Sequence, residues 1–111
     1  MSIRQIPGAI TRALEELQEA LAQVYGERLR GIYLYGSYAR GDFQPDSDVD
    51  VLIVLEGSVL PGREIDRIGD RVADICLAHN VLIATFPVSE EWLRERKSPL
   101  FENVRREGVR L

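Results

Sequence analysis

The sequence has little cysteine and little histidine: Cys76 and His79 are the single examples among its 111 residues. One cysteine cannot form an intrachain disulfide, so a disulfide-stabilised secreted fold is excluded and a reducing compartment is favoured. No apolar run approaches the ~18 residues that a transmembrane helix needs, and residues 1–5 lack the apolar region of a signal peptide. We therefore expect a cytoplasmic protein that has no membrane-spanning segment.

Positive charge is also scarce. The chain has 14 Lys and Arg against 18 Asp and Glu, a net charge of −4. Phosphate backbones are bound by clustered Lys and Arg, so we do not expect a nucleic-acid partner. The charge is uneven, because residues 94–111 carry six basic and three acidic side chains, which leaves residues 1–93 at −7. Such a basic tail is typical of a solvated helix face or of a surface for a partner.

Apolar residues, in contrast, are plentiful. They make up 45% of the chain, enough for a globular core. A chain of this length supports one core rather than two, so residues 1–111 are expected to form a single domain.

The spacing of these apolar residues predicts both helices and strands. Residues 7–25 and 65–80 repeat at three- and four-residue intervals, the pattern of amphipathic helices. Residues 32–35, 49–55 and 81–88 are β-prone, and Pro87 breaks the last of these segments late. Shorter helical segments are expected at 37–40, from Ser89 onward, and at 100–106. The order predicts an α/β domain with a small mixed β-sheet flanked by helices.

The turn after the first predicted strand, Gly36-Ser37, suits a phosphate. Glycine leaves the backbone N–H groups uncovered, and the start of a helix adds a favourable dipole for an anion. By itself this signal is weak, because a Gly-Ser pair after a strand is commonly only a turn.

Asp48 and Asp50 enter the most apolar predicted strand. Residues two apart on a strand face the same side, so both carboxylates converge. Two such carboxylates repel unless a cation lies between them, and hard oxygen ligands suit Mg²⁺ or Mn²⁺. The alternative is that both residues only cap the strand; the Gly-Ser turn on the preceding strand favours the metal site.

Together these segments resemble a known signature. Residues 36–41 (GSYARG) followed by 47–54 (SDVDVLIV) are similar to the Gly-Ser, ten-residue gap, Asp-x-Asp motif of the DNA polymerase β-like nucleotidyltransferase superfamily. The size and the tail 103–109 resemble the minimal nucleotidyltransferases, small proteins commonly encoded beside a HEPN-domain partner in toxin–antitoxin pairs.

The resemblance implies roles for individual residues. Gly36 and Ser37 would hold the β- and γ-phosphates of a nucleoside triphosphate, most simply ATP. Asp48 and Asp50 would be the catalytic ligands of Mg²⁺ or Mn²⁺.

Two other side chains near this motif have open roles. Arg40 would either contact phosphate or brace the loop through Asp42 or Asp46. Tyr35 or Tyr38 would line a base or sugar pocket, unless both only pack in the core.

Active members of the superfamily have a third carboxylate on a later strand, where it activates the incoming hydroxyl. Here that strand, residues 81–88, contains no acid. The nearest carboxylates are Asp74, Glu90 and Glu91, of which Glu90 is the least implausible substitute. General-base assistance is typically worth ~10²–10⁴-fold, so transfer should slow without it.

Two functions follow from the resemblance. The first is metal-dependent transfer of AMP from ATP to a hydroxyl of a partner protein. The alternative is a weakly active or inactive nucleotide-binding, antitoxin-like module that blocks a HEPN-domain partner by contact. An open sheet edge would also permit homo-oligomers.

Overall fold

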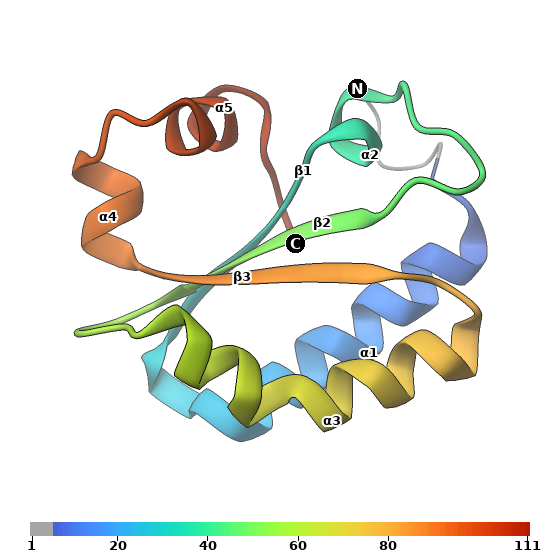
Figure 1. Cartoon of the computed structure of the whole chain (residues 1–111), viewed down its shortest axis with the longest axis horizontal. Helices are drawn as coiled ribbons and strands as arrows, with labels where there is room; N and C mark the ends of the chain where they lie inside the picture. Colours follow the sequence, from blue (N-terminus) through green and yellow to red (C-terminus); the bar gives the residue numbers. More distant parts are fainter. Residues whose placement is uncertain (1–5) are drawn as a thin grey trace.

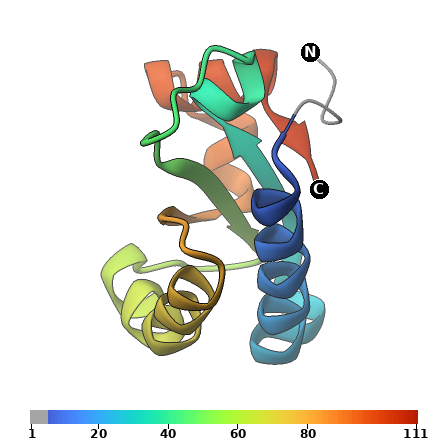
Figure 2. The same cartoon turned by 90° about the vertical axis from the view of Figure 1, so that its right-hand side faces the viewer.

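The computed structural model describes residues 6–111, which form one four-stranded sheet with helices on both faces (Figures 1 and 2). The elements in chain order are α1 (Gly8–Tyr25), the 3₁₀ turn η2 (Gly26–Arg28), β1 (Leu29–Tyr35), α2 (Ser37–Arg40), β2 (Val49–Leu55), α3 (Pro61–His79), β3 (Ile83–Ser89), α4 (Glu90–Glu95), α5 (Pro99–Glu107) and β4 (Val109–Arg110). Residues 1–5, tested above for a signal peptide, lie outside the described part.

The sheet is mixed, with strand order β3-β2-β1-β4. β1 pairs antiparallel with β2 and with β4, whereas β2 and β3 run parallel. A parallel pair needs a crossover connection, and α3 provides it. The predicted α/β class with a small mixed sheet flanked by helices is therefore confirmed.

The two long helices, α1 and α3, cover one face of the sheet (Figure 1). The apolar stripe of α1 packs its fully buried Ala13 and Leu17 into the larger core cluster. β2 contributes the alternate residues Val49, Val51 and Ile53 to the same cluster. No helix within residues 6–111 is long and apolar enough to cross a membrane.

The short helices α4 and α5 cover the other face (Figure 2). Both begin at serines whose hydroxyls accept backbone N–H groups: Ser89 from Glu91 at 3.2 Å and Ser98 from Phe101 at 3.4 Å. Phe101 of α5 packs with Leu52 of β2 in a second, smaller core cluster. Of the two helices, α5 contributes residues to the cavity at the start of β2, where the candidate site is found.

The boundaries of two strands differ from the sequence prediction, and a third strand was not predicted. β1 begins at Leu29 rather than at Ile32, and a bulge between Leu29 and Gly31 accommodates the irregular start. β3 runs through Pro87 to Ser89, because it is an edge strand where a missing N–H costs no ladder hydrogen bond. β4 was not predicted, since two residues have no readable period.

Candidate active site

The two aspartates lie where β2 begins, on the face covered by α4 and α5. Along β2 the side chains alternate, with Val51 in the larger cluster and Leu52 in the smaller one. Asp50 therefore shares the face of Leu52, and Asp48, two residues earlier, extends the same row. Asp50 is half-buried and Asp48 is exposed. The predicted convergence of the two carboxylates follows from this geometry.

Gly36 is required by the approach of β1 to β2. Its backbone has φ 74° and ψ −152°, a region that only glycine occupies readily. A Cβ atom at this position would clash with Asp50 Oδ2. The turn therefore lies directly against the acidic pair, and Ser37 follows as the first residue of α2.

The charges of this region act on one another. Burial raises the pKa of Asp50 above its usual value; the negative charge of Asp48 adds to this and Arg40 opposes it. Burial, followed by the charge of Asp50, also raises the pKa of Tyr35. Asp50 and Tyr35 are register partners across β1 and β2, so both shifts come from one locality. The carboxylates of Asp48 and Asp50 thus repel each other, and a cation bound between them would reduce this repulsion.

A cavity of about 430 Å³ joins these residues. It is lined by side chains or backbone of three segments: the end of β1 with α2, the start of β2, and α5, which together contribute Tyr35, Gly36, Ser37, Arg40, Ser47, Asp48, Asp50, Leu100, Asn103 and Glu107. This volume is within the usual range for small-molecule sites. All five residues predicted from the motif, Gly36, Ser37, Arg40, Asp48 and Asp50, line it; their roles toward a ligand remain predictions.

Arg40 braces the loop that connects α2 to β2. Its Nε atom donates to Asp42 Oδ2 at 3.2 Å, which is the loop-bracing contact predicted as one of its two roles. Within residues 6–111 no such bond joins Arg40 to Asp46. Ser47 orders the same loop by accepting the N–H of Gln44 at 2.8 Å. Arg40 also lines the cavity, so the loop contact and a phosphate contact are compatible.

The two tyrosines separate in the structure. Tyr35 lines the cavity, whereas Tyr38 is buried and stacks on Phe43 with ring centroids 4.4 Å apart. Tyr38 is therefore a core residue, and Tyr35 is the tyrosine available to a ligand.

No acid of β3 reaches the site. In the parallel pair, Ala84 lies opposite Asp50 and Phe86 opposite Leu52. Glu90 follows the far end of β3, six residues beyond Ala84, which is roughly 20 Å along a strand. Asp74 lies on α3, which covers the opposite face. The suggestion that Glu90 takes the place of the third carboxylate is therefore wrong.

The α5 wall of the cavity was missed by the sequence analysis. Leu100, Asn103 and Glu107 line the cavity from the side opposite Asp48 and Asp50. The three residues are spaced by three and four along one helix, so they share one face. That spacing was readable, but the direction of the face depends on tertiary packing.

The carboxylates present suit a hard divalent cation. Among residues 6–111, no group of three or more His, Cys, Asp or Glu is close enough to hold a metal, so Asp48 and Asp50 act as a pair. Mg²⁺ is commonly bound by one or two carboxylates and takes its other ligands from water and substrate phosphates. The donor set therefore fits Mg²⁺ or Mn²⁺ together with a phosphate ligand.

Comparison with known proteins gives a family match over most of the chain. The family described as "Nucleotidyltransferase domain" matches residues 14–99, which include the whole segment from Gly36 to Asp50.

Two curated relatives come from Methanocaldococcus jannaschii. "Putative protein adenylyltransferase MJ0604" is 37% identical over 98 residues, covering 87% of this chain and 92% of the relative. "Putative protein adenylyltransferase MJ0141" is 38% identical over 77 residues, covering 68% of this chain and 75% of the relative.

Solved structures agree on the fold. A crystal structure described as a toxin-antitoxin with AMP-PNP superposes with a TM-score of 0.63 at 20% identity, over 86% of this chain and 69% of that one. A mutant of the toxin-antitoxin MntA-HpeT superposes with a TM-score of 0.61 at 17% identity, over the same shares, 86% and 69%.

Proposed function

The chain belongs to the nucleotidyltransferase domain family, and from this premise we propose that it transfers AMP from ATP to a hydroxyl of a partner protein. The observation that carries the proposal is that Gly36 and Ser37 line one cavity with Asp48 and Asp50. Relatives named as protein adenylyltransferases support AMP as the transferred group and a protein as its acceptor.

In this proposal the turn at Gly36 and Ser37 and the short helix α2 hold the triphosphate. The turn at Gly36 and Ser37 presents backbone N–H groups and a hydroxyl to the phosphates. Arg40, which lines the same cavity, adds a positive charge on that side. By holding the β- and γ-phosphates they would orient the α-phosphate toward an incoming hydroxyl, and such positioning accounts for much of the catalysis of phosphoryl transfer.

Asp48 and Asp50 would hold the divalent cation. When bound, Mg²⁺ supplies charge neutralisation for the phosphates and the leaving pyrophosphate. The raised pKa of Asp50 fits this role, because a carboxylate strained by burial and by a like charge gains most from a cation.

The test is transfer of label from ATP labelled at the α-phosphate, with Mg²⁺ and the protein encoded beside this chain. We expect labelled partner with wild type and none with Asp48→Asn/Asp50→Asn. The matched control is Asp46→Asn, an exposed acid of the same loop outside the cavity. Equal labelling by wild type and the double variant would refute the enzymatic proposal.

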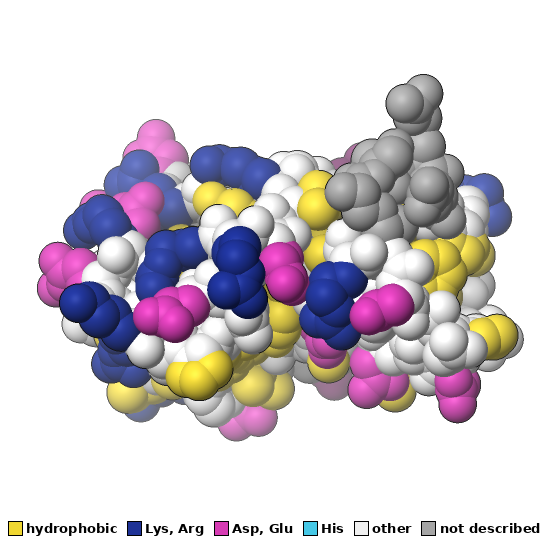
Figure 3. Space-filling view, turned by 90° about the horizontal axis from the view of Figure 1, so that it is seen from above, with side chains coloured by type: hydrophobic (Ala, Val, Ile, Leu, Met, Phe, Trp, Pro, Cys, Tyr) yellow, Lys and Arg dark blue, Asp and Glu magenta, His cyan; other side chains and the backbone are white. Residues whose placement is uncertain are grey.

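A second candidate function is favoured by the acid-free β3. A chain that binds nucleotide but turns over slowly could act as an antitoxin-like module, which neutralises a HEPN-domain partner by contact. The toxin-antitoxin descriptions of the structural neighbours support a partner of this kind. The face over α4 and α5, where Lys and Arg alternate with Asp and Glu, is a candidate contact surface (Figure 3).

Truncation before Arg94 cannot test this surface, because it would remove the core residues Phe101 and Val104. Charge reversal of two exposed residues, Arg94→Glu/Lys97→Glu, leaves the core intact. We expect the double reversal to lose co-purification with the partner and to keep label transfer to a small hydroxyl acceptor. A complex that survives the reversal would exclude the surface over α4 and α5 as the contact.

A further inference from the structure

We propose that Glu107, the last residue of α5, accepts the proton of the attacking hydroxyl in place of the acid that β3 lacks. The inference rests on the proposed transferase function and names a residue that the motif does not contain. Three features support it: apolar residues occupy β3 beside the site, Glu107 lines the cavity with the aspartates, and β4 ties the end of α5 to β1.

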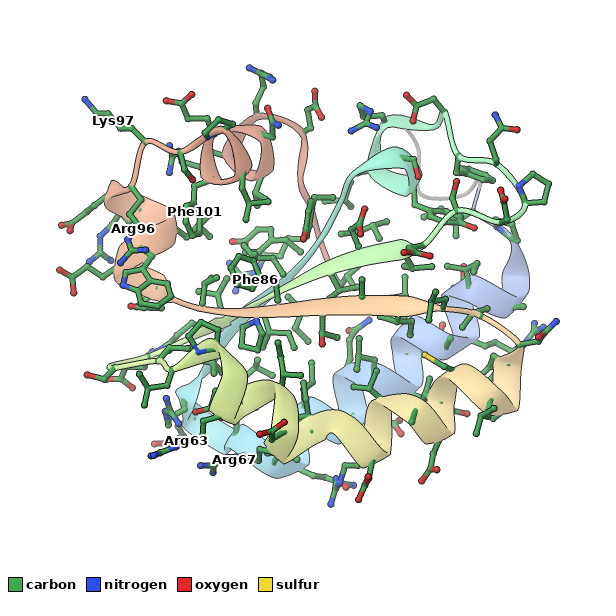
Figure 4. The ribbon with its side chains drawn as sticks, viewed as in Figure 1. Arg63, Arg67, Phe86, Arg96, Lys97 and Phe101 are labelled. Atoms are coloured by element: carbon green, nitrogen blue, oxygen red, sulfur yellow. The ribbon has the colours of Figure 1, made fainter. Side chains whose placement is uncertain are left out.

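The position of a third acid on β3 is filled by apolar side chains. Ala84 and Phe86 are the register partners of Asp50 and Leu52, so they share the face of the site. Phe86 belongs to the smaller core cluster, and its ring points into the space between the sheet and α5, toward Phe101 (Figure 4). A carboxylate in place of Phe86 would remove an aromatic ring from the core that packs against α5.

Glu107 is the acid that faces Asp48 and Asp50 from the α5 side of the cavity. Its side chain is 31% exposed, and its nearest cationic atoms are Arg106 Nη2 at 3.7 Å and Arg40 Nη1 at 3.8 Å. Both distances exceed those of a charge-assisted hydrogen bond, about 2.7–2.9 Å. The carboxylate therefore lies near two positive charges and has no close charged hydrogen-bond partner among residues 6–111.

The chain after α5 fixes Glu107 beside the phosphate-binding turn. β4 pairs with β1 through Tyr33 with Arg110 and Leu34 with Val109. This pairing ties the end of α5 to the end of β1, and Glu107 and Gly36 line the same cavity. Gly108 permits the sharp exit from α5, because a Cβ there would lie 2.5 Å from the carbonyl oxygen of Val104.

In this proposal metal binding and proton acceptance fall to different residues: Asp48 and Asp50 would bind the metal, and Glu107 would accept the proton. No three acids gather around one point in residues 6–111, so Glu107 is not a third metal ligand. It lines the cavity from α5, whereas the Gly36-Ser37 turn and the two aspartates line it from the sheet side. As the acceptor oxygen bonds to phosphorus, its proton moves to Glu107, and the bond from the α-phosphorus to the bridging oxygen breaks to release pyrophosphate.

The experiment compares wild type, Glu107→Gln, Glu107→Ala and the control Glu102→Gln, an exposed acid of α5 that does not line the cavity. Each is tested for transfer of label from ATP with Mg²⁺ to the partner, and for Mg²⁺-ATP affinity by calorimetry. We expect Glu107→Gln to lower kcat by roughly 10²-fold or more, with the Kd of Mg²⁺-ATP within twofold of wild type. Added formate should restore part of the rate of Glu107→Ala, because a small carboxylate can take the vacated place.

Several results would contradict this assignment. Transfer by Glu107→Gln within threefold of wild type refutes it. So does a loss of rate matched by an equal loss of Mg²⁺-ATP affinity without formate rescue, because Glu107 would then act only by bracing Arg40. If wild type itself transfers no label, the proposed transferase function is refuted. That result is distinct from one in which wild type and the Glu107 variants transfer label equally, which refutes only the role of Glu107.

Discussion

At the scale of single residues, Gly36 meets two demands at once. Its positive φ and extended ψ form a conformation that disfavours every side chain, and the carboxylate of Asp50 occupies the space where a Cβ would lie. The same absence of a side chain brings the Gly36-Ser37 turn against Asp50.

We predict that Gly36→Ala loses Mg²⁺-dependent ATP binding and about 1–3 kcal/mol of stability, the usual cost of a residue forced into such a conformation. Calorimetry and urea unfolding measure the two effects. Gly62→Ala is the matched control, because a Cβ at Gly62 in the first turn of α3 meets no atom within 4 Å. Equal behaviour of the two variants would show that the turn tolerates a side chain.

Asp50 gives a prediction with a defined sign. Its folded-state pKa is raised by burial and by Asp48, so the native state binds the proton more tightly than the unfolded chain does, and ionisation costs stability. Without metal, Asp50→Asn should therefore raise the melting temperature at neutral pH. This gain should shrink as the pH falls through the folded-state pKa, where wild type becomes protonated. If Asp50→Asn melted below wild type at neutral pH, the claim that ionised Asp50 destabilises the metal-free fold would be contradicted.

At the scale of elements, the sequence predicted those with a clear period. The stripes of α1 and α3 and the apolar run of β2 are long enough to be read locally. The motif positions 36–50 came from the Gly-Ser and Asp-x-Asp residues themselves and from their resemblance to a known signature. β4 and the inward face of α5 were not predicted. Both depend on segments far away along the chain, which local spacing does not encode: β4 pairs with β1, and Phe101 of α5 packs with Leu52 of β2. Glu107 was missed for this reason.

The parallel pairing of β2 with β3 predicts a way to restore the missing acid. Ala84 is exposed and is the register partner of Asp50, on the same face. In a Glu107→Gln background, Ala84→Asp should raise the transfer rate by roughly tenfold, a modest share of ordinary general-base assistance. Ala84→Asn is the control for shape without charge. An unchanged rate would mean that position 84 does not reach the acceptor hydroxyl.

At the scale of the whole molecule, stability rests on the core between the sheet and the two long helices. Leu17 of α1 is fully buried there, whereas Leu77 of α3 is 82% exposed. Leu17→Ala should cost about 2–5 kcal/mol in urea unfolding. Leu77→Ala should stay within about 0.5 kcal/mol, as is usual for surface positions. If both cost the same, the face that bears Leu77 must be covered in solution, as in a homo-oligomer.

The cavity is assembled from two distant stretches of chain, residues 35–50 and 100–107. A ligand in it therefore bridges the middle of the chain and its last helix, and the site exists only after both are in place. Such a ligand would stabilise the whole domain by binding only its folded form: at 100 times its Kd it would add about 2.7 kcal/mol to the unfolding free energy. A domain whose cavity is occupied would therefore unfold less often and be cleaved more slowly by a protease that attacks the unfolded chain.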